Sequence, residues 1–180
     1  QDKDFLASSD FNFRPVNTYT GPDGCFYIVD MYHGIIQEGE FAEDDSYLNK
    51  KIKALGLEKN KGYGRIYRII HKDFKPDKTK PHLLSQSPME LIQYLSHPNG
   101  WWRDMAQQLM IIHGDTSIKS KLEKIVQDTS LDDHHPLARI HALWTLDGLE
   151  IIDQSLILHA IHDQDPQIRK TAIWISEKWI

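Results

Sequence analysis

The sequence holds one cysteine, Cys25, and this scarcity excludes both an internal disulfide and a Cys-x-x-Cys-His haem attachment site within its 180 residues. No apolar run approaches the roughly 18 residues that would cross a membrane, so we expect no membrane span in this segment. An excess of basic residues is also missing, because 21 Lys and Arg stand against 26 Asp and Glu, a net charge of −5. That balance argues against nucleic acid as a partner.

The chain lacks an initiator methionine and a leader with a charged and then an apolar stretch. It opens Gln1-Asp2-Lys3-Asp4 and enters the apolar run Phe5-Leu6-Ala7 at once. We therefore expect a segment of a longer polypeptide, from which any export signal is separated. With 40% hydrophobic and 26% charged residues, the composition is otherwise that of a globular protein with one or two domains.

The first half has the short alternating segments and turn residues that are typical of an antiparallel sheet. Residues 14–20 and 25–30 flank the cluster Gly21-Pro22-Asp23-Gly24, and this arrangement predicts a hairpin. A third strand is expected at residues 64–70, and residues 5–8 could supply a fourth. So small a sheet has edges that a complete protein would pair or cover.

A connection of roughly thirty residues, long for a compact domain, separates the second and third strands. Its acidic run from Glu38 to Asp45 is interpreted as a solvated loop, because the spacing of an EF-hand is absent. Ser46 then predicts the N-cap of a short helix that extends to about Leu55 and ends at Gly56. The charged, proline-containing stretch from Lys72 to Lys80 is the natural linker to the second half.

An Arg-x-x-Ala signature recurs three times in the second half, each time on a predicted helix that follows a proline. Its arginines, Arg103, Arg139 and Arg169, are separated by 36 and then 30 residues, a period that suits stacked helix pairs of the HEAT type. We expect these arginines to form a structural ladder that bonds carboxylates or carbonyls in adjacent repeats. Ser87-Pro88-Met89-Glu90 predicts a capping box, and Asp165-Pro166 predicts another helix start.

These patterns predict an α+β chain that is mostly helical. Residues 1–80 are expected to form a small antiparallel sheet with a helical insertion. Residues 81–180 are expected to form an α-α solenoid of HEAT-like repeats.

Several stretches carry a family resemblance: Phe11–Val16, Gly21–His33, Gly62–Arg68, His97–Asp104 and Ala138–Leu146. The first three resemble a late blade of the β-propeller in the membrane-bound dehydrogenases related to sorbosone and soluble glucose dehydrogenases. The last two resemble the HEAT region that follows the propeller in that family. The resemblance covers nearly the whole chain.

The resemblance implies that the chain is the C-terminal fragment of an exported, quinoprotein-type sugar or polyol dehydrogenase, periplasmic or extracellular, with residues 1–80 as a partial propeller blade. The parent would use pyrroloquinoline quinone (PQQ) and calcium, and a downstream module would carry haem c. The fragment would hold no cofactor and would be structural and inactive, because most of the propeller is missing. Its expected partners are the rest of its own propeller and the cytochrome module. The alternative is a non-catalytic HEAT-repeat scaffold that binds protein or carbohydrate.

The candidate site residues are Arg14, Asp30 and His33. Arg14 stands beside a strand near the expected propeller axis, where an arginine could clamp a quinone carboxylate. It could also be a structural arginine paired with Asp10 or Asp30. Asp30 and His33 follow the end of a strand, where a carboxylate and an imidazole could serve acid–base chemistry or tie strand ends together.

Other polar and aromatic residues have simpler interpretations. His159 and His162 lie three apart on a helix, but no third ligand is evident, so no metal site is predicted. Trp101-Trp102 could form a binding platform, or place one indole in the core and leave the other partly exposed. Cys25 has no nearby base in sequence and is not expected to be a nucleophile. His134-His135 is predicted to be a loop.

Overall fold

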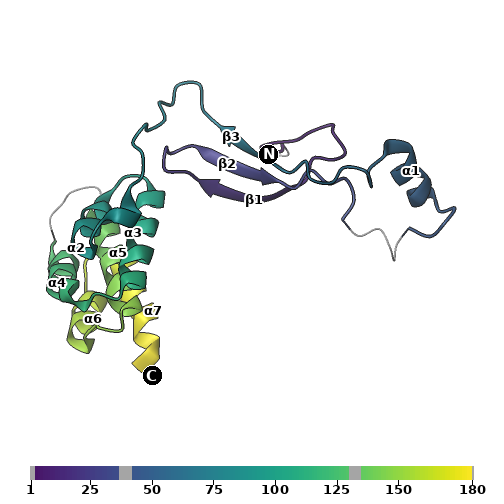
Figure 1. The fold of residues 1–180 in the computed structure, drawn as a ribbon. Helices are drawn as coiled ribbons and strands as arrows, with labels where there is room; N and C mark the ends of the chain where they lie inside the picture. The colour runs from purple at the N-terminus through teal and green to yellow at the C-terminus, as the bar shows by residue number, and fades with distance from the viewer. Residues whose placement is uncertain (1–2, 37–41, 130–134, 180) are drawn as a thin grey trace. The chain divides into compact units, whose positions relative to one another are not determined.

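A computed structural model describes residues 3–36, 42–129 and 135–179 of the protein (Figure 1). The chain divides into two compact units, Gln1–Asp77 and Lys78–Ile180. Over the described ranges, the first contains a three-stranded antiparallel sheet and one helix, and the regular elements of the second are all helical. The predicted α+β, mostly helical class is therefore confirmed. Among the described residues, no helix combines the length and the hydropathy that a membrane span requires.

The sheet of the first unit has the order β1-β2-β3, with every neighbouring pair antiparallel. Its strands are β1 (Pro15–Thr20), β2 (Phe26–Asp30) and β3 (Arg65–Ile69). Gly24, with φ +77°, closes the β1–β2 turn by donating its N–H to the carbonyl of Gly21 at 3.0 Å. The fourth strand suggested at residues 5–8 is not formed. Phe5 instead sets its ring edge-on against Phe26, so this segment contacts the sheet through side chains.

The long β2–β3 connection carries helix α1 (Tyr47–Leu55), and both of its predicted ends are confirmed (Figure 1). Ser46 Oγ accepts the N–H of Asn49, and Gly56 ends the helix at φ +62°. Of the preceding acidic run, residues 37–41 lie outside the described residues. Asp44 and Asp45 are almost fully exposed, 3.8 Å from Lys53 and Lys50 respectively, as the prediction of a solvated loop requires.

The second unit is a succession of helix pairs. In chain order its elements are η1 (Leu83–Ser85), α2 (Pro88–Leu91), η2 (Ile92–Ser96), α3 (Gly100–His113), η3 (Thr116–Ile118), α4 (Lys119–Gln127), α5 (His135–Gly148), α6 (Gln154–Ile161), α7 (Pro166–Ser176) and η4 (Glu177–Trp179). Helix α4 packs on α5 and α6 on α7, while α3, α5 and α7 follow one another as neighbours. The predicted capping box at Ser87 and Glu90 is present.

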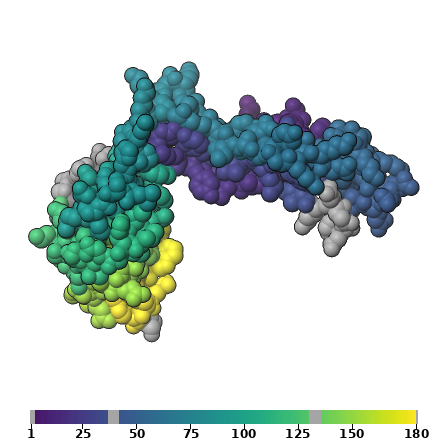
Figure 2. Space-filling model, viewed as in Figure 1, coloured from purple at the N-terminus to yellow at the C-terminus, as the bar shows by residue number. Residues whose placement is uncertain are grey.

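One continuous core fills the second unit. Figure 2 shows the outer surface that encloses it. The three signature alanines, Ala106, Ala142 and Ala172, are each fully buried in it. A methyl side chain suits these positions because closely packed helix axes leave little space at their crossings.

Candidate functional site

The end of strand β2 brings the three candidate residues together. Asp30 is fully buried, and its Oδ1 accepts the backbone N–H groups of Arg14 and Tyr32, each at 2.8 Å. The guanidinium of Arg14 reaches the next turn of chain, where Nη2 donates to the Gly34 carbonyl at 2.7 Å and Nε to the His33 carbonyl at 3.5 Å. His33 therefore takes part through its backbone, while its imidazole is only partly buried.

This geometry favours the structural alternative for Arg14 and Asp30. Asp30 ties the entry of β1 to the exit of β2, and it also holds Tyr32 at φ +46°, a left-handed conformation that is uncommon outside glycine. The Arg14 guanidinium donates to main-chain carbonyls, whereas the sequence suggested an aspartate as its structural partner. The N–H groups on Nε and Nη2 are already engaged by those carbonyls. The geometry favours a structural arginine over a quinone clamp, and we derive no chemical step through a quinone.

The exit of β2 is further ordered by Tyr32. Its hydroxyl donates to Asp10 Oδ2 at 2.8 Å, and the Arg65 guanidinium lies 3.5 Å from the centre of its ring. The bond to Asp10 raises the pKa of the Tyr32 hydroxyl. The pKa of Asp10 is lowered, first by the hydrogen bond from the Asn12 N–H and second by the one from the Tyr32 hydroxyl. Two buried acceptors here, Asp30 Oδ2 and Asn12 Oδ1, have no hydrogen-bond donor among the described residues.

The opposite end of the sheet has a carboxylate that sequence reasoning did not single out. Asp23, in the β1–β2 turn, accepts the Cys25 N–H at 3.0 Å and the Tyr27 hydroxyl at 2.9 Å, and pairs with Arg68 at 2.6 Å. Burial raises the pKa of Asp23, but these bonds and the Arg68 charge together hold it below its ordinary value. The turn sequence identified a hairpin but could not reveal Arg68, which is supplied by β3. Cys25 is buried.

The repeated arginines of the helical unit make two kinds of bond. Arg103 Nη1 donates to the carbonyls of His97 and Pro98, six and five residues before it. Arg169 Nη1 donates to the carbonyls of Asp163 and Gln164 at the same two offsets. Each arginine thus closes the loop that leads into its own helix. We predicted that these arginines would bond carbonyls in adjacent repeats. That prediction is wrong for the carbonyl bonds of Arg103 and Arg169, which stay within one repeat.

Arg139 does connect adjacent repeats, as predicted. Its Nε donates to the Val126 carbonyl of α4 at 2.8 Å, and its two terminal nitrogens grip the carboxylate of Asp163, just after α6. Both side chains are 5% exposed. Burial raises the pKa of Asp163, but the bonds from Arg139 and from the Asp165 N–H keep it below its ordinary value.

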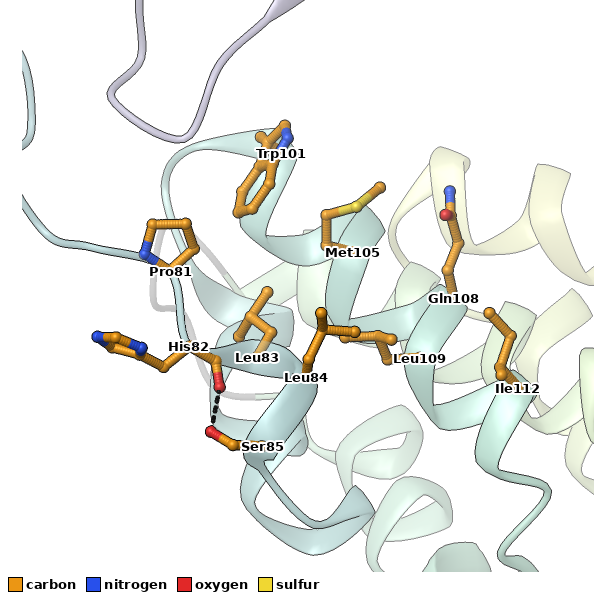
Figure 3. Close-up of a pocket in the computed structure, with 10 residues that line it drawn as sticks. All are labelled: Pro81, His82, Leu83, Leu84, Ser85, Trp101, Met105, Gln108, Leu109 and Ile112. Carbon is orange, nitrogen blue, oxygen red and sulfur yellow. Dashed lines mark hydrogen bonds between the residues drawn. The ribbon is translucent and has the colours of Figure 1, made fainter.

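An apolar groove of about 510 Å³ lies between the segment that contains η1 and one face of α3 (Figure 3). The Ser85 hydroxyl donates to the His82 carbonyl at 2.8 Å, and buried Leu83 anchors the segment. Leu84 and Ile112, by contrast, are 85% and 77% exposed. The residues that line the groove are Pro81, His82, Leu83, Leu84, Ser85, Trp101, Met105, Gln108, Leu109 and Ile112.

The two tryptophans and the histidine pair can be compared with their simpler interpretations. Trp102 is buried and stacks on Tyr94, whereas Trp101 is half-buried at the groove. The described residues contain no group of three potential metal ligands. His134 lies outside them, and the loop prediction is wrong for His135, which begins α5. A helix start there was obscured because two histidines carry no capping signal.

Comparison with known proteins places a similarity on the first unit. Residues 1–73 match the sequence model of a family described as a domain of unknown function (DUF7133). No curated protein and no solved structure matches the chain. The match includes all three strands and α1 but stops before the helical unit.

Proposed function

We propose that this chain is the structural, non-catalytic C-terminal part of an exported quinoprotein-type sugar or polyol dehydrogenase. In this role the sheet unit contributes strands to a β-propeller. The helical unit, a set of HEAT-like repeats, serves as an adaptor toward a cytochrome module. The stretches Phe11–Val16, Gly21–His33 and Gly62–Arg68, which carry the family resemblance, support the assignment of the parent.

The open face of the sheet is the observation that carries the structural part of the proposal. Strand alternation and register put Tyr19, Tyr27, Val29 and Ile66 on one face, opposite the face that Phe5 and Phe13 contact. Tyr19 and Ile66 remain 57% and 68% exposed. Asn17 and Arg68 share this face, which therefore exposes aromatic and aliphatic side chains beside polar ones. Exposed apolar side chains on one face of a three-stranded sheet are typical of a part that packs against further sheet.

The polar residues of the sheet support a non-catalytic role. Asp30 is fully buried and its Oδ1 accepts two backbone N–H groups, while the Arg14 guanidinium donates to backbone carbonyls, so both side chains have a structural role. The buried Asp30 Oδ2, which has no donor among the described residues, is consistent with a donor from a neighbouring propeller strand.

A dye-linked dehydrogenase assay tests the catalytic side. The chain, supplied with PQQ and calcium, should not oxidise aldoses or polyols, whereas the longer natural polypeptide that contains it should. Sustained turnover by the chain alone would show that its residues form a working site. No turnover by the longer polypeptide would remove the dehydrogenase assignment.

The replacement Ile66→Glu tests the structural side. It should leave the melting temperature of this chain nearly unchanged, because the side chain is exposed, and lower that of the longer polypeptide by several degrees. Lys121→Glu, an exposed change on α4, is the matched control and should be neutral in both. Equal effects of Ile66→Glu in the two proteins would contradict packing on this face.

The groove favours a second function, a HEAT-repeat scaffold that binds protein or carbohydrate. Its apolar wall with a few polar groups is typical of a binding site. Calorimetric titration with glucan oligosaccharides should then show saturable binding that Met105→Glu abolishes and Leu158→Glu, at an exposed leucine outside the groove, preserves. Absence of binding in the wild-type chain would remove the carbohydrate form of this proposal.

A further inference from the structure

One histidine in the helical unit bridges two helix pairs. The His141 side chain is 14% exposed and projects from α5 toward α3. Its Nε2 lies 3.3 Å from Arg103 Nε, and its Nδ1 lies 2.7 Å from Gln107 Oε1. Arg103 is held in place independently, because its Nη1 donates to the His97 and Pro98 carbonyls.

These contacts define the protonation state of the ring. A guanidinium nitrogen can only donate, so His141 Nε2 must carry the lone pair that accepts from Arg103. The proton of the neutral imidazole is then on Nδ1, where it is donated to the Gln107 carboxamide oxygen. A neutral ring with this tautomer satisfies both partners on α3.

A second proton on the ring would oppose this arrangement. It would place an N–H on Nε2 against the Arg103 N–H, and a second positive charge 3.3 Å from the guanidinium. Among the described residues, the charged groups that act on the imidazole are Arg103 and Asp104, both on α3; α4, α7 and η2, which also pack on α5, contribute none. Asp104 Oδ1 is 3.9 Å from Nε2 and largely exposed, so its compensation is partial.

We propose that His141 is an acid-sensitive latch between the first two helix pairs, which joins α3 to α5 when neutral and loosens them when protonated. This inference does not depend on the proposed dehydrogenase role. It concerns the helix that forms one wall of the groove, because Trp101, Met105 and Leu109 lie on the same α3 as the latch residues.

The direction of the pH effect follows from the folded-state pKa. Burial, together with Arg103, lowers the pKa of His141 below its ordinary value of 6.5, although Asp104 acts in the opposite sense. As the pH falls through that value, the unfolded chain binds the proton first. The contribution of His141 to stability is therefore complete above about pH 6.5 and declines below it.

Urea unfolding of the full chain at about pH 7.5 and about pH 5 tests the latch. The replacement His141→Gln keeps an acceptor and a donor but cannot titrate, and His113→Gln removes an exposed histidine as the control. Acid should raise the unfolding equilibrium constant of the wild type and of His113→Gln, by about tenfold for each pKa unit of depression. The rise should be much smaller in His141→Gln, and an equal rise in all three would overturn the proposal.

Nitrogen-15 NMR of the wild-type histidines gives a readout that does not depend on a variant. His141 should show protonated Nδ1 and unprotonated Nε2 at neutral pH, and its midpoint should lie below the ordinary histidine value of 6.5. Asp104→Asn should lower its midpoint further, because it removes the carboxylate that favours the proton. A proton on Nε2, or an ordinary midpoint, would contradict the latch whatever the stability data show.

Discussion

The three repeated arginines use their donors differently, although Arg103 and Arg169 both bond loop carbonyls and Arg103 also donates to the His141 ring. Arg103 and Arg169 lie after an open loop and take two loop carbonyls each. Arg139 lies deeper, between α4 and the end of α6, where it meets a carbonyl and a buried carboxylate. The shared sequence signature thus provides one donor group at an equivalent place in each helix, and its contacts among the described residues differ from one arginine to the next.

Replacing Arg139 by methionine should destabilise the chain strongly. The change leaves the Asp163 carboxylate buried without its main partner, a loss of about 3–5 kcal/mol in the free energy of unfolding. The double variant Arg139→Met, Asp163→Leu should recover much of that loss, because no buried charge remains. Chemical denaturation near neutral pH measures all three proteins.

The exposed pair Lys119–Asp153 provides the control for that experiment. Lys119→Met should change the unfolding free energy by less than about 1 kcal/mol, since water already solvates both charges.

The pKa of Asp163 is lowered by Arg139, so the stability that the Asp163 carboxylate contributes is present above its ordinary pKa of 3.8 and is lost in stronger acid. The difference in unfolding free energy between the wild type and Arg139→Met should therefore become smaller at about pH 3. A pH-independent difference, or a nearly neutral Arg139→Met, would show that the pair contributes little.

At the scale of single helices and strands, local sequence signals predicted the end of a helix correctly where hydrogen bonds between nearby residues determine that end. Ser46, Gly56 and the capping box at Ser87 and Glu90 all act within four residues of chain, and the structure places each as predicted. The N-cap Asp165 likewise accepts the N–H of Gln167 at 2.7 Å. These motifs are readable because both partners are near one another in the sequence.

Sequence signals were insufficient where the partner comes from elsewhere in the fold. Met89 lies three residues before the buried Ile92, a helical spacing that predicts a shared face, but it is itself 52% exposed. The partners of Arg14 lie 19 and 20 residues away, and the contact of Gln107 with His141 spans 34. The candidate residues could be named from the sequence, but the bonds that define their roles could not.

The N-cap of α7 should make a measurable contribution to the free energy of unfolding. Asp165→Ala removes the acceptor for the Gln167 N–H and should lower the unfolding free energy by about 1 kcal/mol, whereas Asp165→Asn or Asp165→Ser should retain most of it. Asp153, the N-cap of α6, makes no side-chain cap bond, so Asp153→Ala is the matched comparison. If the alanine and asparagine variants of Asp165 were equally stable, the cap bond would not contribute.

At the scale of the whole chain, the two units differ in the amount of apolar side chain they bury. The core of the helical unit forms one cluster that extends from Leu83 to Ile175. Among the described residues of the sheet unit, the buried apolar side chains are Cys25, Ile28 and Ile52. Hydrophobic burial is the main favourable term in folding, so the helical unit should have the larger free energy of opening.

Hydrogen exchange followed by mass spectrometry should resolve this difference in one experiment. After correction for intrinsic rates, amides of β1 and β3 should exchange at least about tenfold faster than those of α5, which corresponds to about 1.4 kcal/mol or more in opening free energy. Leu143→Ala, which removes a fully buried side chain of the helical core, should accelerate exchange in α3, α5 and α7 together, because these neighbours share that core. The same change should leave β1–β3 unaltered, since Leu143 belongs to a cluster that contains no residue of the sheet. Protection of β1 equal to that of α5 would mean that the open sheet is stabilised by more than its own buried side chains, and acceleration confined to α5 would mean that the helix pairs open independently of one another.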